Sequence, residues 1–130
     1  QIEVSDETCR NPQTGHLCRF DFLVAQLNLF IELDGPMGHF GLNYRQEDDV
    51  NSPKRDFYKE EWALHNGYCM IRLLQADVFH DKSNWDTWLL DTISSIKPGQ
   101  IITQDRKEYT EGIYAELRRV DVEIHPAFRE

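Results

Sequence analysis

The stretch HLCRFDFLVAQLNLFIELD, residues 16–34, decides the fold, because two apolar runs in it are separated by a short polar interruption. Residues 16–25 and 28–34 are rich in Phe, Val, Leu and Ile, which is typical of strands. A turn of two or four residues centred on Gln26 and Leu27 would join them, although it lacks the favoured Asn-Gly type. The stretch therefore predicts a β-hairpin.

The expected hairpin register places carboxylates opposite each other. A turn centred at that point makes Phe22 face Ile31 and Asp21 face Glu32. Opposed residues on paired strands have Cβ atoms roughly 5 Å apart. Two carboxylates at that spacing repel each other unless a cation or a proton lies between them. The register therefore predicts a cation site at Asp21 and Glu32, with Asp34 as a nearby third carboxylate. The alternative is a solvated sheet face that carries acids without a function.

Strand alternation assigns each residue of the hairpin to a face. The apolar face is expected to hold Phe20, Phe22, Val24, Leu29, Ile31 and Leu33. The opposite face is expected to hold Arg19, Asp21, Leu23, Ala25, Asn28, Phe30, Glu32 and Asp34. The end of this second face farthest from the turn is thus polar and acidic.

The rest of the chain predicts further strands and helices around this hairpin. The expected elements are a strand at 1–4, a loop at 5–15, a helix capped by Ser52 and ending near His65 before Gly67, a strand at 68–74, a helix capped by Ser83, a short strand at 100–103 and a last helix within 109–120. A core-facing stripe at helical spacing is formed by Trp85, Trp88, Leu89, Ile93 and Ile96. The fold class is therefore α/β or α+β, a mixed sheet flanked by helices.

Length and composition limit the classes of protein. The 130 residues fit a single domain, with a core at 8–96 and a C-terminal extension of unknown role at 97–130. No stretch of about 18 apolar residues predicts a membrane span. Gln1 begins the chain without a charged, apolar leader, so we expect no signal peptide and missing residues upstream. The net charge of −9 counts against a protein that coats duplex DNA by charge alone, although a basic face and a bound cation remain compatible with it.

The three cysteines indicate a reducing, intracellular compartment, in the cytoplasm or nucleus, because an odd number does not make a disulfide framework. Cys9, His16 and Cys18 invite a zinc interpretation. Their spacing matches no common structural zinc site and no fourth ligand is evident, so two ordinary thiols are the preferred interpretation.

Together these segments resemble the PD-(D/E)XK nuclease superfamily, and most of all its branch related to the very-short-patch repair endonucleases, which includes proteins of bacteria and large DNA viruses. The resemblance covers roughly residues 8–96. It rests on the segments RFDF (19–22), FIELDGP (30–36), HF (39–40), KRDFYK (54–59), NGY (66–68), IRLLQ (71–75) and QADV (75–78). It implies a restriction-endonuclease-like fold and phosphodiester hydrolysis with Mg²⁺, for which Mn²⁺ substitutes.

The resemblance also implies roles for individual residues. Asp21 and Glu32 match the metal-binding acids of the superfamily. Asp34 stands where many members have the catalytic lysine, and an Asp at this position is common in this branch. Asp34 is also a third candidate metal ligand. His39 follows Gly35 by four residues, like the catalytic His of the mismatch-repair enzymes, and a His can act as general acid or base near neutral pH. The alternative for His39 is a loop histidine that only hydrogen-bonds.

Two residues further along the chain match the helix of the family. Asp56 and Lys59 lie three apart on one helix face. Lys59 is expected to replace the missing lysine, at the phosphate or at the attacking water, and the alternative is an exposed ion pair of little weight. Arg72 is expected to bind phosphate or to pair with a carboxylate, and Gln75 to orient a neighbouring group.

The sequence therefore predicts a Mg²⁺-dependent DNA endonuclease that nicks or cuts at a site or structure. One alternative is an inactive nucleic-acid-binding module that retains the fold, since a fold does not guarantee its chemistry. Another is a domain of a larger protein that uses the fold only for partner binding. The expected partner is duplex or structured DNA, with no membrane partner, and the chain is expected to be a monomer or a homodimer.

Overall fold

The computed structural model describes residues 4–11, 14–35, 51–111 and 115 of the chain. The elements in chain order are β1 (Val4–Arg10), β2 (Leu17–Phe20), β3 (Phe22–Val24), the 3-10 helix η1 (Ala25–Leu27), β4 (Leu29–Asp34), α1 (Asn51–His65), β5 (Cys69–Leu74), α2 (Gln75–Phe79), α3 (Trp85–Ser95), β6 (Ile101–Thr103) and α4 (Lys107–Thr110). Strands and helices alternate along much of the chain, which confirms the expected α+β class.

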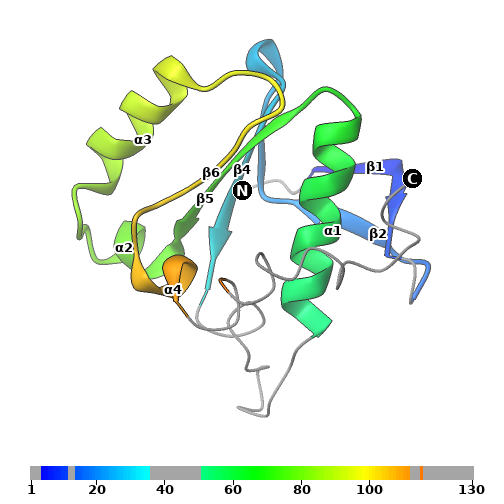
Figure 1. The fold of residues 1–130 in the computed structure, drawn as a ribbon, viewed down its shortest axis with the longest axis horizontal. Coiled ribbons are helices and arrows are strands. Elements are labelled where there is room, and N and C mark those ends of the chain that lie inside the picture. Colours follow the sequence, from blue (N-terminus) through cyan, green and yellow to red (C-terminus); the bar gives the residue numbers. More distant parts are fainter. Residues whose placement is uncertain (1–3, 12–13, 36–50, 112–114, 116–130) are drawn as a thin grey trace.

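Four of the strands form one mixed sheet in the order β3-β4-β5-β6. β3 and β4 are antiparallel, whereas β4, β5 and β6 run parallel to one another. Parallel neighbours need a crossover, and α1 supplies the first one and α2 with α3 the second. Figure 1 shows α1 and α3 on opposite sides of the sheet, so helices flank both of its faces.

The hairpin forms in the expected register. Phe22 pairs with Ile31 across β3 and β4, and Leu23 pairs with Phe30. The four-residue connection is η1 followed by Asn28, whose left-handed backbone (φ 49°) closes the turn. The prediction from the apolar pattern was therefore correct, and extending the register by one residue places Asp21 beside Glu32.

The long strand expected at 16–25 is interrupted at Asp21. Residues before it form β2, which pairs with β1, and residues after it form β3, which pairs with β4. The bend changes which face the neighbouring side chains occupy. Phe20 is buried and stacks on Phe30 with ring centroids 4.0 Å apart, whereas Phe22 is 37% exposed. The predicted apolar face was thus wrong at Phe20, which lies with Phe30, whereas Phe22 keeps its expected pairing with Ile31 but is not buried.

The expected loop at 5–15 was also wrong, because most of it forms β1. This strand pairs antiparallel with β2, with Ser5 opposite Arg19 and Arg10 opposite Leu17 and an irregular register between these pairs. Its sequence, VSDETCR, is mainly polar. A mainly polar strand lacks the apolar alternation by which strands are predicted.

Two apolar clusters pack against the two faces of the sheet. The cluster on the α1 side contains Cys9, Cys18, Phe20, Phe30, Tyr58, Trp62, Ala63 and Met70. The cluster on the α3 side contains Leu29, Cys69, Ile71 and Leu73, with Trp85, Trp88, Leu89, Ile93 and Ile96 packed against it. The tryptophan stripe therefore faces the core as expected. β5 lies between the clusters, and all six of its residues are buried.

The helix ends differ in how well the sequence predicts them. Gly67, with φ +83°, follows α1 as expected. α3 begins at Trp85 without a side-chain cap, after Ser83 and Asn84 in left-handed conformations, so Ser83 is not the cap that we expected. The last helix was expected within 109–120, but the described part is the short α4, and residues 116–120 lie outside the described residues.

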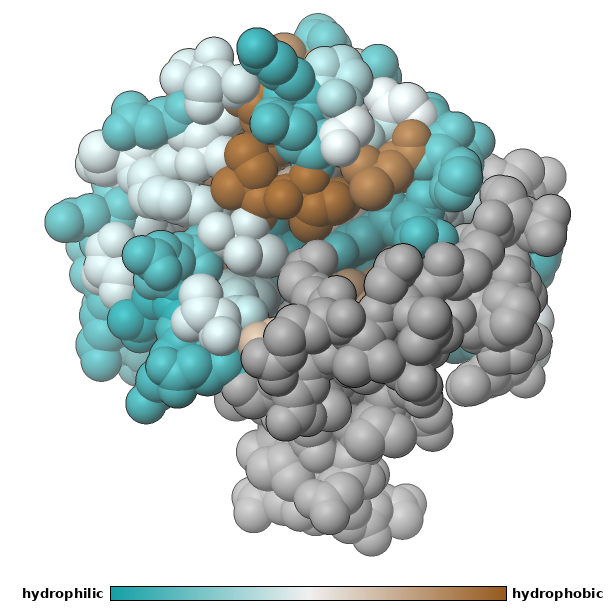
Figure 2. Space-filling model, viewed as in Figure 1, coloured by the Kyte–Doolittle hydropathy of each residue, from teal (hydrophilic) through white to brown (hydrophobic). Residues whose placement is uncertain are grey.

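The surface of the described part gives no sign of a membrane span, since none of the described helices is both long enough and apolar enough to cross a bilayer. On the face drawn in Figure 2, apolar side chains gather in one band among hydrophilic surroundings.

Candidate active site

Asp21 and Glu32 meet where the strand bends, and each carboxylate binds the backbone of the other strand. The Asp21 N–H donates to Glu32 Oε2 (2.7 Å), and the Leu33 N–H donates to Asp21 Oδ2 (2.8 Å). These bonds satisfy backbone groups at the interruption between β2 and β3. Glu32 is 2% exposed, so its carboxylate is nearly withdrawn from water. The two acids therefore lie together as the sequence predicts, but under α1 instead of on a solvated face.

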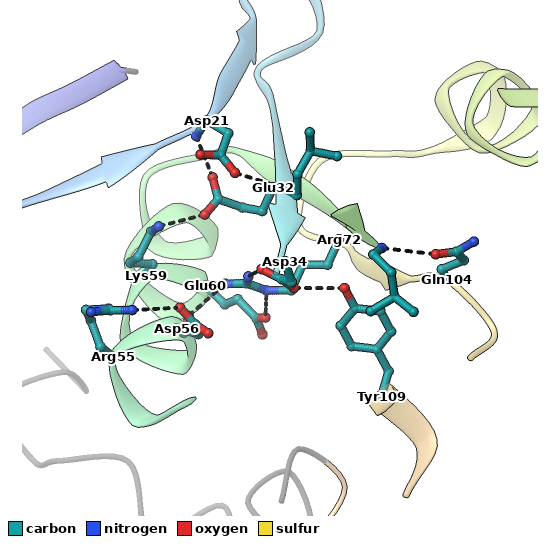
Figure 3. A network of polar contacts seen from close by, with 12 residues as sticks. Asp21, Glu32, Asp34, Arg55, Asp56, Lys59, Glu60, Arg72, Gln104 and Tyr109 are labelled. Carbon is teal, nitrogen blue, oxygen red and sulfur yellow. Dashed lines mark hydrogen bonds and ion pairs between the residues drawn. The ribbon is translucent and has the colours of Figure 1, made fainter. Parts of the chain in front are cut away.

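Lys59 of α1 completes a group of three charged side chains. Its Nζ donates to Glu32 Oε1 over 2.6 Å and lies 4.9 Å from the centroid of the Phe20 ring. Lys59 is 6% exposed, so it is not half of an exposed ion pair with Asp56. The ammonium offsets the charge of a buried carboxylate that would otherwise be costly. Figure 3 shows Lys59 directed from α1 toward Glu32, with Asp21 on the far side of that carboxylate.

These three residues line a cleft of about 540 Å³ between the β1–β2 hairpin, the end of β4 and α1. Arg19 and Arg55 also line it. Among the described residues, the lining thus has three cations and two carboxylates, although the whole chain carries a net charge of −9. A local excess of cations attracts anionic groups into a cleft. The site is therefore chemically suited to a phosphate.

Asp34 does not join Asp21 and Glu32. Arg72 NH1 donates to Asp34 Oδ1 (2.9 Å) and the Tyr109 hydroxyl donates to Asp34 Oδ2 (2.8 Å). All three of these side chains are buried. Burial, and then the neighbouring Asp34 carboxylate, raise the pKa of Tyr109 far above its usual value. We therefore correct the assignment of Asp34 as a metal ligand, since its two oxygens serve an internal network.

Arg72 is the centre of that network and is fully buried. Besides Asp34, its guanidinium donates to Glu60 Oε2 (2.6 Å) and to the backbone carbonyl of Asp56 (3.2 Å). Of the two roles expected from the sequence, pairing with a carboxylate is the one observed. The network fastens α1 to β4 and β5, as Figure 3 shows. It positions the helix that carries Lys59, but it does not line the cleft.

The other residues of the expected site are His39 and Gln75, and two arginines also line the cleft. His39 lies outside the described residues, so its role stays a prediction. Gln75 lines the cleft, and a Cβ on Gly35 would come within 2.9 Å of Gln75 Oε1, while its orienting role stays a prediction. Sequence reasoning missed Arg19 and Arg55. The available signal for Arg55 was its position four residues before Lys59, which places both on one face of α1.

The cleft places cations and carboxylates side by side. Among the described residues no three His, Cys, Asp or Glu side chains gather into a metal-holding group. Mg²⁺, however, is held by one or two carboxylates together with water and substrate phosphates. Asp21 and Glu32 satisfy that smaller requirement. Comparison with known proteins returned no matching family model, no matching curated protein and no matching solved structure.

Proposed function

We propose that this protein is a metal-dependent endonuclease that hydrolyses phosphodiester bonds in DNA, related to the PD-(D/E)XK superfamily and its very-short-patch repair branch. The observation that supports it is the meeting of Asp21, Glu32 and Lys59 on the wall of one cleft. Two acids from adjacent strands and one lysine are the groups that the resemblance implies. Here the lysine comes from α1 instead of from β4, where Asp34 stands.

The donors at Asp21 and Glu32 fit Mg²⁺, because both supply hard carboxylate oxygens on a cleft that opens to water and substrate. When bound, the ion supplies charge stabilisation at the scissile phosphate and lowers the pKa of a bound water. The protein's own part is to hold these carboxylates in place. The hydrogen bonds from Leu33 and Asp21 N–H fix their orientation before the substrate arrives.

The cations of the cleft position the substrate in this proposal. Arg55, with a side chain 40% exposed, reaches the cleft from α1 and offers a planar donor group to phosphate oxygens. Arg19 is exposed on β2 at the same cleft. Lys59 donates to Glu32 Oε1 over 2.6 Å, and in this proposal its ammonium also contacts the phosphate or the attacking water. His39 is proposed as general acid or base from the resemblance alone.

A second candidate is an inactive nucleic-acid-binding module, and a specific observation favours it. Both oxygens of Glu32 already accept hydrogen bonds inside the protein, from Lys59 and from the Asp21 N–H. A carboxylate whose charge is offset by an internal lysine attracts a metal ion less strongly. This candidate keeps the cations of the cleft and gives up the hydrolysis.

Nicking of supercoiled plasmid in Mg²⁺ or Mn²⁺ distinguishes the two candidates. Asp21→Asn is the best variant, because the amide oxygen can still accept from the Leu33 N–H while the charge is removed. Asp86→Asn makes the same change at an exposed acid of α3, and it is the matched control. We expect metal-dependent nicking by the wild type and the control, and a loss of about 100-fold or more for Asp21→Asn, as for loss of a transition-state charge contact.

Two further measurements separate a loss of folding and a loss of metal binding from a loss of catalysis. Circular dichroism and the urea midpoint report whether Asp21→Asn stays folded. Calorimetry with Mg²⁺ and Mn²⁺ reports metal binding without any substrate. Folded wild-type protein that neither binds metal nor cuts plasmid, linear duplex or branched DNA would contradict the nuclease proposal. DNA binding in that case would support the inactive module.

A further inference from the structure

Two buried thiols face each other beside the cleft, and neither has a part in the proposed hydrolysis. Arg10 pairs with Leu17, so the residues next to them, Cys9 on β1 and Cys18 on β2, lie side by side across the hairpin. Cys9 is fully buried and Cys18 is 4% exposed. A side-chain hydrogen bond joins the two thiols. The register between β1 and β2 shifts between Ser5 and Arg10.

Cys18 has the surroundings that favour a thiolate. It lines the cleft, and 4% of its surface is exposed. The hydrogen bond from Cys9 lowers the pKa of Cys18, and the positive charges of Lys59 and Arg55 lower it further against the effect of burial. Thiolates beside cations are the cysteines that peroxides oxidise first.

Cys69 provides an internal comparison. It is 1% exposed in the cluster on the α3 side of the sheet and does not line the cleft. Its thiol lies 3.5 Å from the Asn28 carbonyl oxygen, and burial raises its pKa. A protonated thiol in an apolar cluster is inert to mild oxidants. The three thiols thus divide into a pair beside the cleft and a third thiol in the apolar cluster.

We propose that Cys9 and Cys18 form a reversible oxidation site, in which a peroxide converts the two thiols into a disulfide across the β1–β2 hairpin. The Cys18 thiolate attacks a peroxide oxygen and becomes a sulfenic acid, while the O–O bond breaks and the first water leaves after protonation. The Cys9 sulfur then attacks the Cys18 sulfur, an S–S bond forms, and the second water leaves with the Cys9 proton. Two thiols are oxidised and one peroxide is reduced to two waters.

The bond would join β1 to β2 three residues before Asp21. It would also remove the thiol that Lys59 and Arg55 influence. This site does not depend on the nuclease proposal, because the two thiols, their cations and the cleft are present whatever the cleft binds.

The test treats the folded, reduced chain with an equivalent of hydrogen peroxide and measures intact mass before and after dithiothreitol. We expect the loss of two hydrogen atoms from the monomer, restored by the reductant. Blocking of remaining thiols followed by peptide mapping should show Cys9 joined to Cys18 and Cys69 blocked as a free thiol. The variant Cys69→Ala should behave like the wild type.

Two further variants assign the order of the steps. Cys9→Ser should leave a sulfenic acid at Cys18 that dimedone traps, whereas Cys18→Ser should leave Cys9 without one. Circular dichroism checks that each variant is folded. Recovery of both thiols unoxidised from folded wild type, or a disulfide that involves Cys69 or a second chain, would overturn the proposal.

Discussion

At the scale of single residues, the hydroxyl of Tyr109 stabilises a buried charge from far along the chain. It donates to Asp34 Oδ2 over 2.8 Å, while Arg72 donates to the other oxygen. A hydrogen bond to a charged group is worth about 1.5–3 kcal/mol. Tyr109→Phe leaves Asp34 without this donor, so we expect the free energy of unfolding at pH 7 to fall by about that amount. Urea unfolding followed by fluorescence measures it.

The same tyrosine predicts a dependence on alkaline pH. Burial, with the Asp34 carboxylate beside it, raises the pKa of Tyr109 in the folded protein. In the unfolded chain the phenol loses its proton above pH ~10, so the unfolded state then binds fewer protons than the folded state. The contribution of Tyr109 is complete below that pH, and above it the free energy of unfolding falls by up to about 1.4 kcal/mol per pH unit.

Comparison of the wild type with Tyr109→Phe from pH 8 to 11 isolates this effect, since Tyr58, whose pKa burial also raises, is present in both proteins. The stability difference between them should narrow as the pH rises above ~10. A constant difference over that range would show that the Tyr109 pKa is not raised.

The local sequence pattern predicted the positions of Asp21 and Glu32 but not the partners of Asp34. Asp21 and Glu32 followed from strand alternation and one turn position, because their partners are close in sequence. The partners of Asp34 lie 38 and 75 residues away along the chain, at Arg72 and Tyr109. No periodicity within the β4 segment encodes such contacts, so the exclusion of Asp34 from the site required the structure.

At the scale of elements, the interruption at Asp21 lets one run of sequence serve two sheets. β2 pairs with β1 and β3 continues into the main sheet. The end signals at Ser52 and Gly67 predicted α1. The apolar pattern predicted β4, β5 and α3. It did not predict β1, because that strand pairs through its backbone and is mostly polar in sequence. Arg19 and Cys18, which line the cleft, lie on β2, and β2 pairs with the strand that the pattern missed.

The C-terminus of α1 permits a prediction for a single element. The Tyr68 N–H donates to the Ala63 carbonyl (2.9 Å) and the Gly67 N–H to the Leu64 carbonyl (3.3 Å), while Gly67 has φ +83°. This is the Schellman pattern, which needs a left-handed residue. A Cβ at Gly67 would meet no atom within 4 Å, so Gly67→Ala costs only backbone strain.

We expect Gly67→Ala to lower the free energy of unfolding by about 1 kcal/mol. Gly67→Asn is the matched variant, because Asn tolerates the left-handed region better, and it should lose less. Urea midpoints of the three proteins measure the order. An alanine variant as stable as the wild type, or an asparagine variant equally destabilised, would argue against a strained left-handed position.

At the scale of the whole molecule, the distribution of charge matters more than its sum. The chain carries −9, but several of its acids are neutralised internally: Glu32 by Lys59, Asp34 and Glu60 by Arg72, and Asp77 by Arg106. Arg19 and Arg55 line the cleft, and Arg55 NH2 also lies 3.8 Å from Asp56 Oδ1. An acidic protein can therefore present a local cationic surface to a polyanion, which net charge alone does not reveal.

If DNA lies in that cleft, its phosphates should release counterions when Arg55 binds them. We expect DNA binding by the Asp21→Asn variant, measured without divalent metal, to weaken as the salt concentration rises. In the double variant Asp21→Asn, Arg55→Ala, the slope of log K against log salt should be smaller by about one. Lys82→Ala is the matched control, since Lys82 is exposed after α2 and does not line the cleft. Because a phosphate contact carries no sequence information, the loss should be similar for different DNA sequences. Equal slopes for the Arg55 and Lys82 variants would mean that DNA does not contact this wall of the cleft, and the cations there would then have to act only on Asp21 and Glu32.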